Sequence, residues 1–318
     1  MGAQFHCMWS FYSNQARTAV LDKIQSAGVT WVRIDVSWAG IEDSAKGARN
    51  AWYISTVDFC VNEARARGLN VLITLWMTPN WANGGRGNFV PPNNPQDYGD
   101  FAQWAAGYWH GRVQAWEVWN EPDPNQSFWQ GTVGQYVNLL QAAYPKFKAG
   151  DQTATVVLGA PSSNDDSWIR QVYSLGARNS FDVLATHPYQ GVADAPPEHP
   201  DDNHRWWFTH LPAVRQVMID YLDGAKPIWF TEFGWSAHAN WDGIPNWQRG
   251  VTPAQQADYL LRAIRYTNTN YPYVPVMFWY KERSNPNGGD VHQEGYGFLN
   301  ADLSERPILG ALRSYYFG

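Results

Sequence analysis

The chain has 318 residues, of which 44% are hydrophobic, and it carries a formal net charge of -6. This length and apolar content support one large domain or two ordinary ones. The sequence has no run of Lys and Arg that would indicate nucleic acid or an anionic membrane as a partner, and no apolar run approaches the roughly 18 residues that a membrane-spanning helix needs.

Strand-like and helix-like segments alternate along the whole chain. Short apolar or alternating runs predict strands at Ala3–Trp9, Thr30–Val36, Leu69–Trp76, Val113–Trp119, Ala154–Ala160, Asp182–His187, Pro227–Phe233 and Val274–Tyr280. Apolar residues at helical spacing predict helices at Asn14–Ala27, Ile54–Arg67, Tyr98–His110, Gly134–Lys148, Asp166–Leu175, His204–Leu222, Pro253–Asn268 and Ser304–Tyr316. Eight strand–helix units without a large gap predict an α/β fold, namely a single (β/α)8 TIM barrel that spans residues 1–318.

A doubly wound open sheet is the competing architecture, but the segment Phe11-Tyr12-Ser13-Asn14 is not the Gly-rich fingerprint that usually follows its first strand. The longer connecting segments all follow strands, so in a barrel they would gather on one face. Eight tryptophans are expected to collect there: Trp38, Trp81, Trp129, Trp206, Trp207, Trp235, Trp241 and Trp247. Indole stacks well on the flat C–H faces of sugars. The 19 Trp residues of the chain are therefore a hint at carbohydrate, beside their ordinary role in core packing.

Two predicted strands end on a glutamate. The fourth strand leads into Asn120-Glu121-Pro122, where Pro122 cannot donate a ladder hydrogen bond and favours an extended Glu121. The seventh strand ends in Thr231-Glu232-Phe233. Strands four and seven lie three apart around a ring of eight, so their tips face each other across the barrel mouth. Two carboxyl groups so placed can bracket a glycosidic bond, where one donates a proton and the other attacks or activates water.

Arg33 lies inside an apolar strand, where an unpaired cation is rare. It is interpreted either as the partner of Asp35 or Glu63 in an ion pair, or as a cation beside Glu232 that keeps that carboxylate ionised. His187 at the tip of strand six has two open readings, a satisfied core histidine or a hydrogen-bond partner of the nucleophile and the substrate.

Other strand tips supply candidates for the walls of a sugar site. Tyr189 is a second possible hydrogen-bond partner of the nucleophile and the substrate, and Trp279 on strand eight is a candidate stacking floor. His6 on strand one and Trp76 on strand three would complete the wall, although Trp76 also suits core packing.

Cys7 and Cys60 are the two cysteines, and neither belongs to a metal-binding C-x-x-C spacing. A disulfide is possible, but two buried free thiols are the favoured expectation because Cys packs well as a small apolar residue. The N-terminus shows no basic region followed by an apolar stretch, so the compartment stays open. An extracellular location is favoured if a leader has been removed.

Five segments together resemble a known clan. Trp119-Asn120-Glu121-Pro122 and Thr231-Glu232-Phe233-Gly234-Trp235 are similar to the acid/base and nucleophile motifs of retaining glycoside hydrolases on (β/α)8 barrels, and Gly28-Val29-Thr30-Trp31-Val32-Arg33 is similar to their strand-two signature. The segment from Thr74 to Ala82 and the segment Thr186-His187-Pro188-Tyr189 resemble glycoside hydrolase family 39 more than family 5.

The resemblance implies double displacement with retention, in which Glu121 is the acid/base and Glu232 the nucleophile. It also implies that Asn120 hydrogen-bonds the sugar 2-hydroxyl, and it adds Trp235 as a candidate substrate contact. The expected partner is an oligo- or polysaccharide, the expected state is a monomer, and neither a cofactor nor a metal is expected. The chain shows no counterpart of the extra β-domain of family 39 xylosidases and iduronidases, which favours internal cleavage of a polysaccharide.

Three alternative functions stay open, and one loop is a possible calcium site. The protein could be an exo-acting, xylosidase-like β-glycosidase or a carbohydrate-binding barrel without catalysis. A metal-dependent barrel could use His6, His187 and Asp residues, although strand one has no His-x-His. The acidic loop Asp194–His204 could bind calcium, but a solvated polar loop is the favoured reading.

Overall fold

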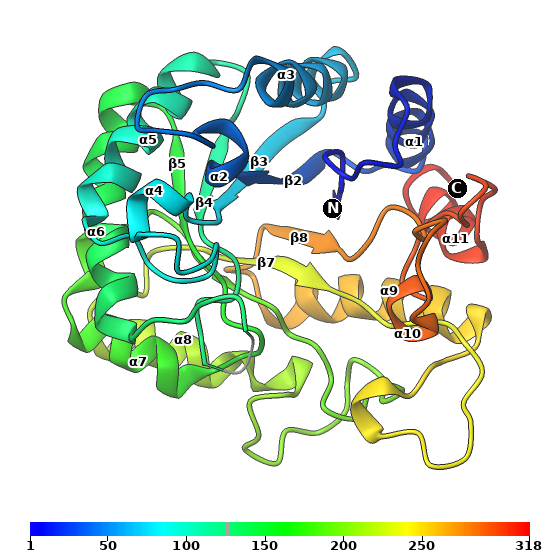
Figure 1. The fold of residues 1–318 in the computed structure, drawn as a ribbon. Coiled ribbons are helices and arrows are strands. Elements are labelled where there is room, and N and C mark those ends of the chain that lie inside the picture. The colour runs from blue at the N-terminus through cyan, green and yellow to red at the C-terminus, as the bar shows by residue number, and fades with distance from the viewer. Residues whose placement is uncertain (125–126) are drawn as a thin grey trace.

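A computed structural model describes residues 1–124 and 127–318 as eight parallel strands with helices around the outside (Figure 1). The strands are β1 Gly2–Gln4, β2 Trp31–Ser37, β3 Asn70–Trp76, β4 Ala115–Val118, β5 Thr155–Leu158, β6 Leu184–Thr186, β7 Ile228–Phe233 and β8 Val276–Trp279. They follow the order β5-β4-β3-β2-β1-β8-β7-β6. A parallel bridge between Val157 and Val183 joins the two ends of this order. The predicted (β/α)8 barrel is therefore confirmed.

The helices between the strands begin and end close to their predicted limits. They are α1 Asn14–Ser26, α3 Ala51–Ala66, α5 Pro95–Tyr108, α6 Val133–Gly150, α7 Asp166–Ser174, α8 Leu211–Asp220, α9 Pro253–Asn270 and α11 Pro307–Phe317. Short helices α2 Trp38–Ile41, α4 Asn80–Asn83 and α10 Val291–Glu294 lie within the connections after strands. Helix α8 starts later than predicted because Pro212 fits only the first turn of a helix. None of these helices combines the length and the apolar character that a membrane crossing requires.

Side chains alternate between the barrel interior and the helix layer, as the period of a strand dictates. The interior cluster contains Trp229 of β7 and Phe278 of β8 together with smaller residues of the other strands. The next residue of β8, Trp279, belongs to the outer cluster, which includes the buried faces of the helices. Strand parity thus decides which aromatic residues face the interior.

Two irregularities interrupt that parity where the predicted catalytic residues lie. Between β7 and β8, Phe230 pairs with Met277 and Phe233 pairs with Trp279, so β7 has one residue more than its partner. Such a bulge re-aims side chains. After β4, the backbone of Trp119 has φ 74° and that of Glu121 has φ 45°. The expected extended conformation of Glu121 is therefore wrong, and the left-handed backbone is what turns the chain at this tip.

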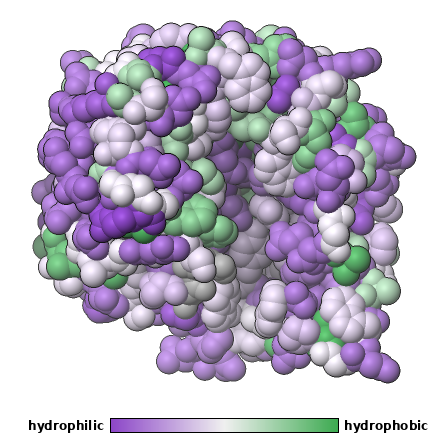
Figure 2. Space-filling model, viewed as in Figure 1, coloured by the Kyte–Doolittle hydropathy of each residue, from purple (hydrophilic) through white to green (hydrophobic). Residues whose placement is uncertain are grey.

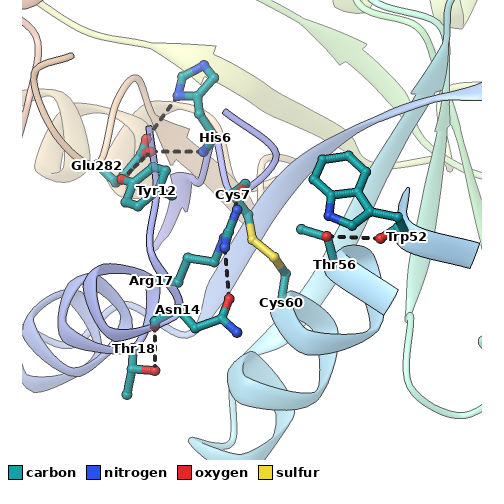
Figure 3. The surroundings of a disulfide bond; sticks show 10 residues. All are labelled: His6, Cys7, Tyr12, Asn14, Arg17, Thr18, Trp52, Thr56, Cys60 and Glu282. Carbon is teal, nitrogen blue, oxygen red and sulfur yellow. Dashed lines mark hydrogen bonds and ion pairs between the residues drawn. A yellow bond between two sulfur atoms is a disulfide. The ribbon is translucent and has the colours of Figure 1, made fainter. Parts of the chain in front are cut away.

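Cys7, which follows β1, and Cys60 of α3 form a disulfide whose Cα atoms are 6.4 Å apart (Figure 3). The expectation of two free thiols is wrong, because the barrel brings both buried cysteines together across a sequence separation of 53. Arg17 donates to the carbonyl oxygen of Cys7 at 2.9 Å and secures the same segment to α1. The residue before the disulfide is His6, so the bond anchors one wall of the barrel mouth.

Removal of this covalent link is expected to destabilise the fold. The double variant Cys7→Ala/Cys60→Ala should lose about 2–4 kcal/mol of unfolding free energy, because the unfolded chain regains the entropy that the cross-link removes. Urea unfolding of the wild type and the variant, each with and without reductant, measures the change. The reductant should destabilise the wild type alone, and an equal effect on both proteins would contradict the assignment.

Candidate active site

A cavity of about 790 Å³ lies where the carboxyl ends of the strands meet. Figure 2 shows the hollow in the middle of the face that Figure 1 presents. Glu121, which follows β4, and Glu232 of β7 both line it. One carboxylate oxygen of Glu121 lies within 4.8 Å of one carboxylate oxygen of Glu232. The two strand tips therefore bring both acids to one place, although 111 positions separate them in the sequence.

Arg33 of β2 is a buried cation that contacts Glu232 and Glu117. Its side chain is 1% exposed. The guanidinium donates to Glu117 Oε2 at 2.8 Å, to Glu232 Oε1 at 2.7 Å and to Asn120 Oδ1 at 2.6 Å. A further bond of 2.8 Å reaches Gln4 Oε1 on β1. The reading of Arg33 as a cation beside Glu232 thus fits its position, while direct contact with a substrate does not, because Arg33 lies beneath the cavity lining.

Glu232 accepts two hydrogen bonds that favour its ionised form. Arg33 binds Oε1, and the hydroxyl of Tyr189 donates to Oε2 at 2.9 Å. Burial raises the pKa of the Glu232 carboxyl group, and the positive charge of Arg33 is among the influences that oppose that rise.

Glu121 has a different environment. Burial, followed by the negative charge of Asp123, raises the pKa of Glu121 to about 8, and the opposing effect of Arg33 is smaller. The Oε1 atom of Glu121 lies 2.8 Å from Nδ1 of His187, whose ring is fully buried. Burial lowers the pKa of that ring. His187 therefore contacts Glu121 directly, and its buried ring is not part of the cavity lining where a substrate contact was expected.

Asn120 and Tyr189 lie on the cavity surface next to the acids. Arg33 donates to Oδ1 of Asn120, which fixes the orientation of the amide and directs its NH2 group away from the guanidinium. That NH2 group is a donor suited to a sugar hydroxyl.

His6 and Trp76 also line the cavity, on the walls above β1 and β3. The His6 ring stacks on Trp9 with centroids 3.9 Å apart, and its Nδ1 lies 3.0 Å from Glu282 Oε2 (Figure 3). The Trp76 ring packs against Phe128 with centroids 5.6 Å apart. Both positions agree with a role in the wall of a sugar site.

The structure places two predicted sugar contacts elsewhere. Trp279 is 0% exposed and donates to the carbonyl of Tyr296, and Trp235 is 1% exposed and donates to the carbonyl of Ala195. Strand parity turns Trp279 toward the helix layer, and Trp235, which follows β7, stacks on it there with centroids 6.4 Å apart, so both rings are buried away from the cavity. Tyr280, one residue after Trp279, lines the cavity instead.

The loop tryptophans behave similarly. Trp206 and Trp247 line the cavity, whereas Trp38, Trp129 and Trp207 are buried packing residues. The Trp excess therefore serves packing more than the sequence suggested.

Several residues that line the cavity were not predicted from the sequence. Asp35 lines the cavity and accepts a 2.7 Å hydrogen bond from Gln4, whereas the sequence suggested it only as an ion-pair partner. Its position two residues after Arg33 places it on the same face of β2, which is the signal that could have identified it. Trp9 and Tyr296 lie on connections after strands and carried no such signal.

Two groups of residues contain side chains that could bind a metal ion. Ligand atoms of Glu121, His187 and Glu232 lie within 4.8 Å of one another. Each of these side chains has the protein hydrogen bonds described above, so the donor set is already engaged. In the acidic loop, Asp194 pairs with Arg249 at 2.7 Å and Glu198 with Arg262 at 2.5 Å. These arginines neutralise carboxylates that a calcium ion would need.

Comparison with known proteins places this site in a family. The family described as Cellulase (glycosyl hydrolase family 5) matches residues 2–281. A β-xylosidase of Caldicellulosiruptor saccharolyticus is 31% identical over 113 residues, which is 33% of this chain and 23% of that protein.

Solved structures share the fold. A family 39 glycoside hydrolase from Bacteroides cellulosilyticus WH2 superimposes with a TM-score of 0.79 at 22% identity, covering 99% of this chain and 62% of that one. A monomeric β-xylosidase from Caulobacter crescentus CB15 superimposes with a TM-score of 0.70 at 16% identity, covering 100% of this chain and 67% of that one. The chain thus spans less than two thirds of the Bacteroides protein and about a quarter of the curated xylosidase. Together with the two opposed glutamates, the match over residues 2–281 shows that the chain belongs to the cellulase family, glycosyl hydrolase family 5, within the (β/α)8-barrel clan of retaining glycoside hydrolases.

Proposed function

We propose that this glycoside hydrolase cleaves its substrate by double displacement, with Glu232 as the nucleophile and Glu121 as the acid/base. The main support for the proposal is that a carboxylate oxygen of Glu232 lies within 4.8 Å of a carboxylate oxygen of Glu121. Retaining enzymes hold the two carboxyl groups about 5–5.5 Å apart, whereas inverting enzymes need about 6.5–9.5 Å to admit a water molecule. The short separation supports direct attack by a carboxylate.

The two environments support the division of roles. Arg33 and Tyr189 stabilise Glu232 as a carboxylate, which attacks the anomeric carbon. Glu121 keeps its proton near neutral pH and gives it to the glycosidic oxygen as the bond to the leaving group breaks. In the second step, the Glu121 carboxylate takes a proton from water, the water oxygen bonds to the anomeric carbon, and Glu232 is released.

Charge in the cavity supports a neutral glycan as the substrate. The lining includes the carboxylates of Asp35 and Glu232 beside the protonated Glu121, and among the residues that the structure describes neither Lys nor Arg lines it. A uronic acid or a sulfated sugar would therefore lack a cationic partner and would meet like charge. Trp9, Trp76 and Tyr280 offer aromatic surface to the uncharged faces of sugar rings.

We further propose internal cleavage of a neutral oligo- or polysaccharide. Aromatic residues from connections after β1, β6 and β7, namely Trp9, Trp206 and Trp247, surround the catalytic pair. A cavity of about 790 Å³ is large among ligand sites, which usually hold about 300–1,000 Å³, and has room for more than one sugar unit. The second candidate is exo action, which is favoured by the similarity to a β-xylosidase and to an exo-β-1,4-mannosidase from Opitutaceae bacterium strain TAV5.

The nucleophile assignment predicts chemical rescue. Glu232→Ala should lose at least about 10⁴-fold in kcat, because no other group forms the glycosyl-enzyme bond. Added azide should restore turnover and give a glycosyl azide of inverted configuration, which NMR identifies. Hydrolysis by Glu232→Ala without an added nucleophile would refute the assignment.

The matched variant Glu121→Ala tests the acid. It should lose far more rate on natural glycosidic linkages than on activated aryl glycosides, whose leaving groups depart without a proton. Equal losses on both substrate types would show that Glu121 is not the acid.

Glu121 also predicts a pH-dependent stability. Its folded pKa is about 8 against an ordinary value of 4.5, so between these values the folded protein holds a proton that the unfolded chain has lost. This component of the unfolding free energy is complete below pH 4.5, decreases as the pH rises toward 8, and is absent above it. Urea unfolding should be measured across this pH window. The unfolding free energy of Glu121→Gln, relative to that of the wild type, should increase as the pH rises. A constant difference between the two proteins would contradict the raised pKa.

Products on defined polysaccharides test the substrate proposal. Neutral polysaccharides should be shortened to oligosaccharides, while chains rich in uronic acids should remain intact because the cavity repels them. Chromatography of products over time, with and without a chelator, measures both outcomes. Release of monosaccharide alone would establish exo action, and loss of activity with chelator would favour the metal-dependent alternative.

A further inference from the structure

A buried chain of hydrogen bonds connects Glu117 of β4 with Glu121. Oγ1 of Thr231 on β7 lies 2.7 Å from Glu117 Oε1 and 3.1 Å from Nε2 of His187. Nδ1 of the same ring lies 2.8 Å from Glu121 Oε1. Glu117, Thr231 and His187 are all 0% exposed, so water does not compete for these bonds.

Glu117 determines which groups donate and which accept in this series of hydrogen bonds. Its Oε2 accepts from Arg33 Nε at 2.8 Å and from the Thr74 hydroxyl at 2.6 Å. A carboxylate paired with a buried guanidinium is ionised and only accepts hydrogen bonds. The single hydroxyl hydrogen of Thr231 therefore points to Oε1 of Glu117.

This direction fixes the tautomer of His187. Because the Thr231 hydrogen is committed to Glu117, Oγ1 of Thr231 must accept the bond from Nε2 of His187. A neutral imidazole carries one N–H group, so Nδ1 then presents a lone pair to Glu121. Two lone pairs at 2.8 Å would repel, and the bond between Nδ1 and Oε1 requires a proton that belongs to Glu121.

We propose that Thr231, anchored by Glu117, is a positioning residue that fixes the Nε2–H tautomer of His187 and thereby holds the acid proton on Glu121. The inference rests on the proposed role of Glu121 as the acid/base. Donation requires the O–H bond of Glu121 to turn from Nδ1 toward the cavity, and once the glycosidic oxygen has taken the proton, the bare Nδ1 lone pair faces a carboxylate. The same repulsion then favours return of a proton from the attacking water, which completes the cycle without any further donor.

The alternative to a neutral ring is an imidazolium beside a Glu121 carboxylate. Burial is the largest influence on the pKa of His187 and lowers it, which opposes an imidazolium. The charged groups that act on the ring are Glu232, Arg33, Glu117 and Asp123. Those that act on Glu121 are Asp123, Arg33, Glu117 and Asp35. Glu232, Glu117 and Asp123 favour a charged ring, but burial outweighs them. At Glu121, the negative charges of Asp123, Glu117 and Asp35 all oppose a second carboxylate.

The direct test is the protonation state of the free enzyme. Nitrogen NMR of histidine-labelled protein at neutral pH should show His187 with a protonated Nε2 and a bare Nδ1. Its resonances are identified by their absence in His187→Gln. A protonated Nδ1 in a neutral ring, or a doubly protonated ring, would overturn the proposal. This readout needs no turnover, so it is decided separately from the roles of Glu121 and Glu232 in hydrolysis.

Variants test the role of the hydroxyl. Thr231→Val keeps the β-branched shape of the side chain but removes the link, so the ring can present Nδ1–H to an ionised Glu121. The basic limb of the kcat/KM–pH profile should move down by at least about one pH unit. In Thr231→Ser, the basic limb should lie at the same pH as in the wild type, because the hydroxyl is present. In Thr74→Val, which removes a different donor to Glu117, the basic limb should also keep the wild-type pH. An unmoved limb in folded Thr231→Val would overturn the proposal, and if that variant does not fold, the NMR result alone decides.

Discussion

The site depends on one buried cation. The guanidinium of Arg33 binds side chains of β1 and β7 and two residues of the β4 tip, Glu117 and Asn120, and thereby ties strands from opposite sides of the barrel to β2. A cation this deeply buried is tolerated only because carboxylates surround it, and those carboxylates are tolerated only because of the cation. Loss of the guanidinium would leave buried negative charge unpaired. The position of Glu232, the proposed nucleophile, and the integrity of the barrel centre therefore share one interaction.

Two glutamates at similar strand tips acquire different chemistry from their neighbours. Glu232 receives donors from Arg33 and Tyr189, which stabilise a carboxylate. Glu121 faces Asp123 and the buried ring of His187, and its pKa rises to about 8. The difference comes from the direction of hydrogen bonds as much as from burial, because both acids are buried to a similar degree.

Much of the architecture could be predicted because its signals are local. The alternation of apolar strands and amphipathic helices predicted eight units, and an arginine inside an apolar strand predicted a buried ion pair. The predictions failed where one residue of register matters. Trp279 and Phe278 are neighbouring aromatic residues, yet parity turns the first toward the helices and the second into the barrel. The disulfide was also missed, since nothing local shows that Cys7 and Cys60 meet.

The sequence by itself determined the barrel, the two acids at the tips of strands four and seven, and the presence of a cation near them. The barrel follows from the period of apolar residues along each segment. The cation follows from the high free energy of an unpaired buried charge, and both signals can be read within a short segment. The tertiary structure decided which tryptophans line the cavity, that β7 carries an extra residue between Phe230 and Phe233, and that Thr231 and His187 bridge Glu117 to Glu121. Each of these depends on contacts between strands far apart in the chain, and barrel closure alone fixes which side chains meet there.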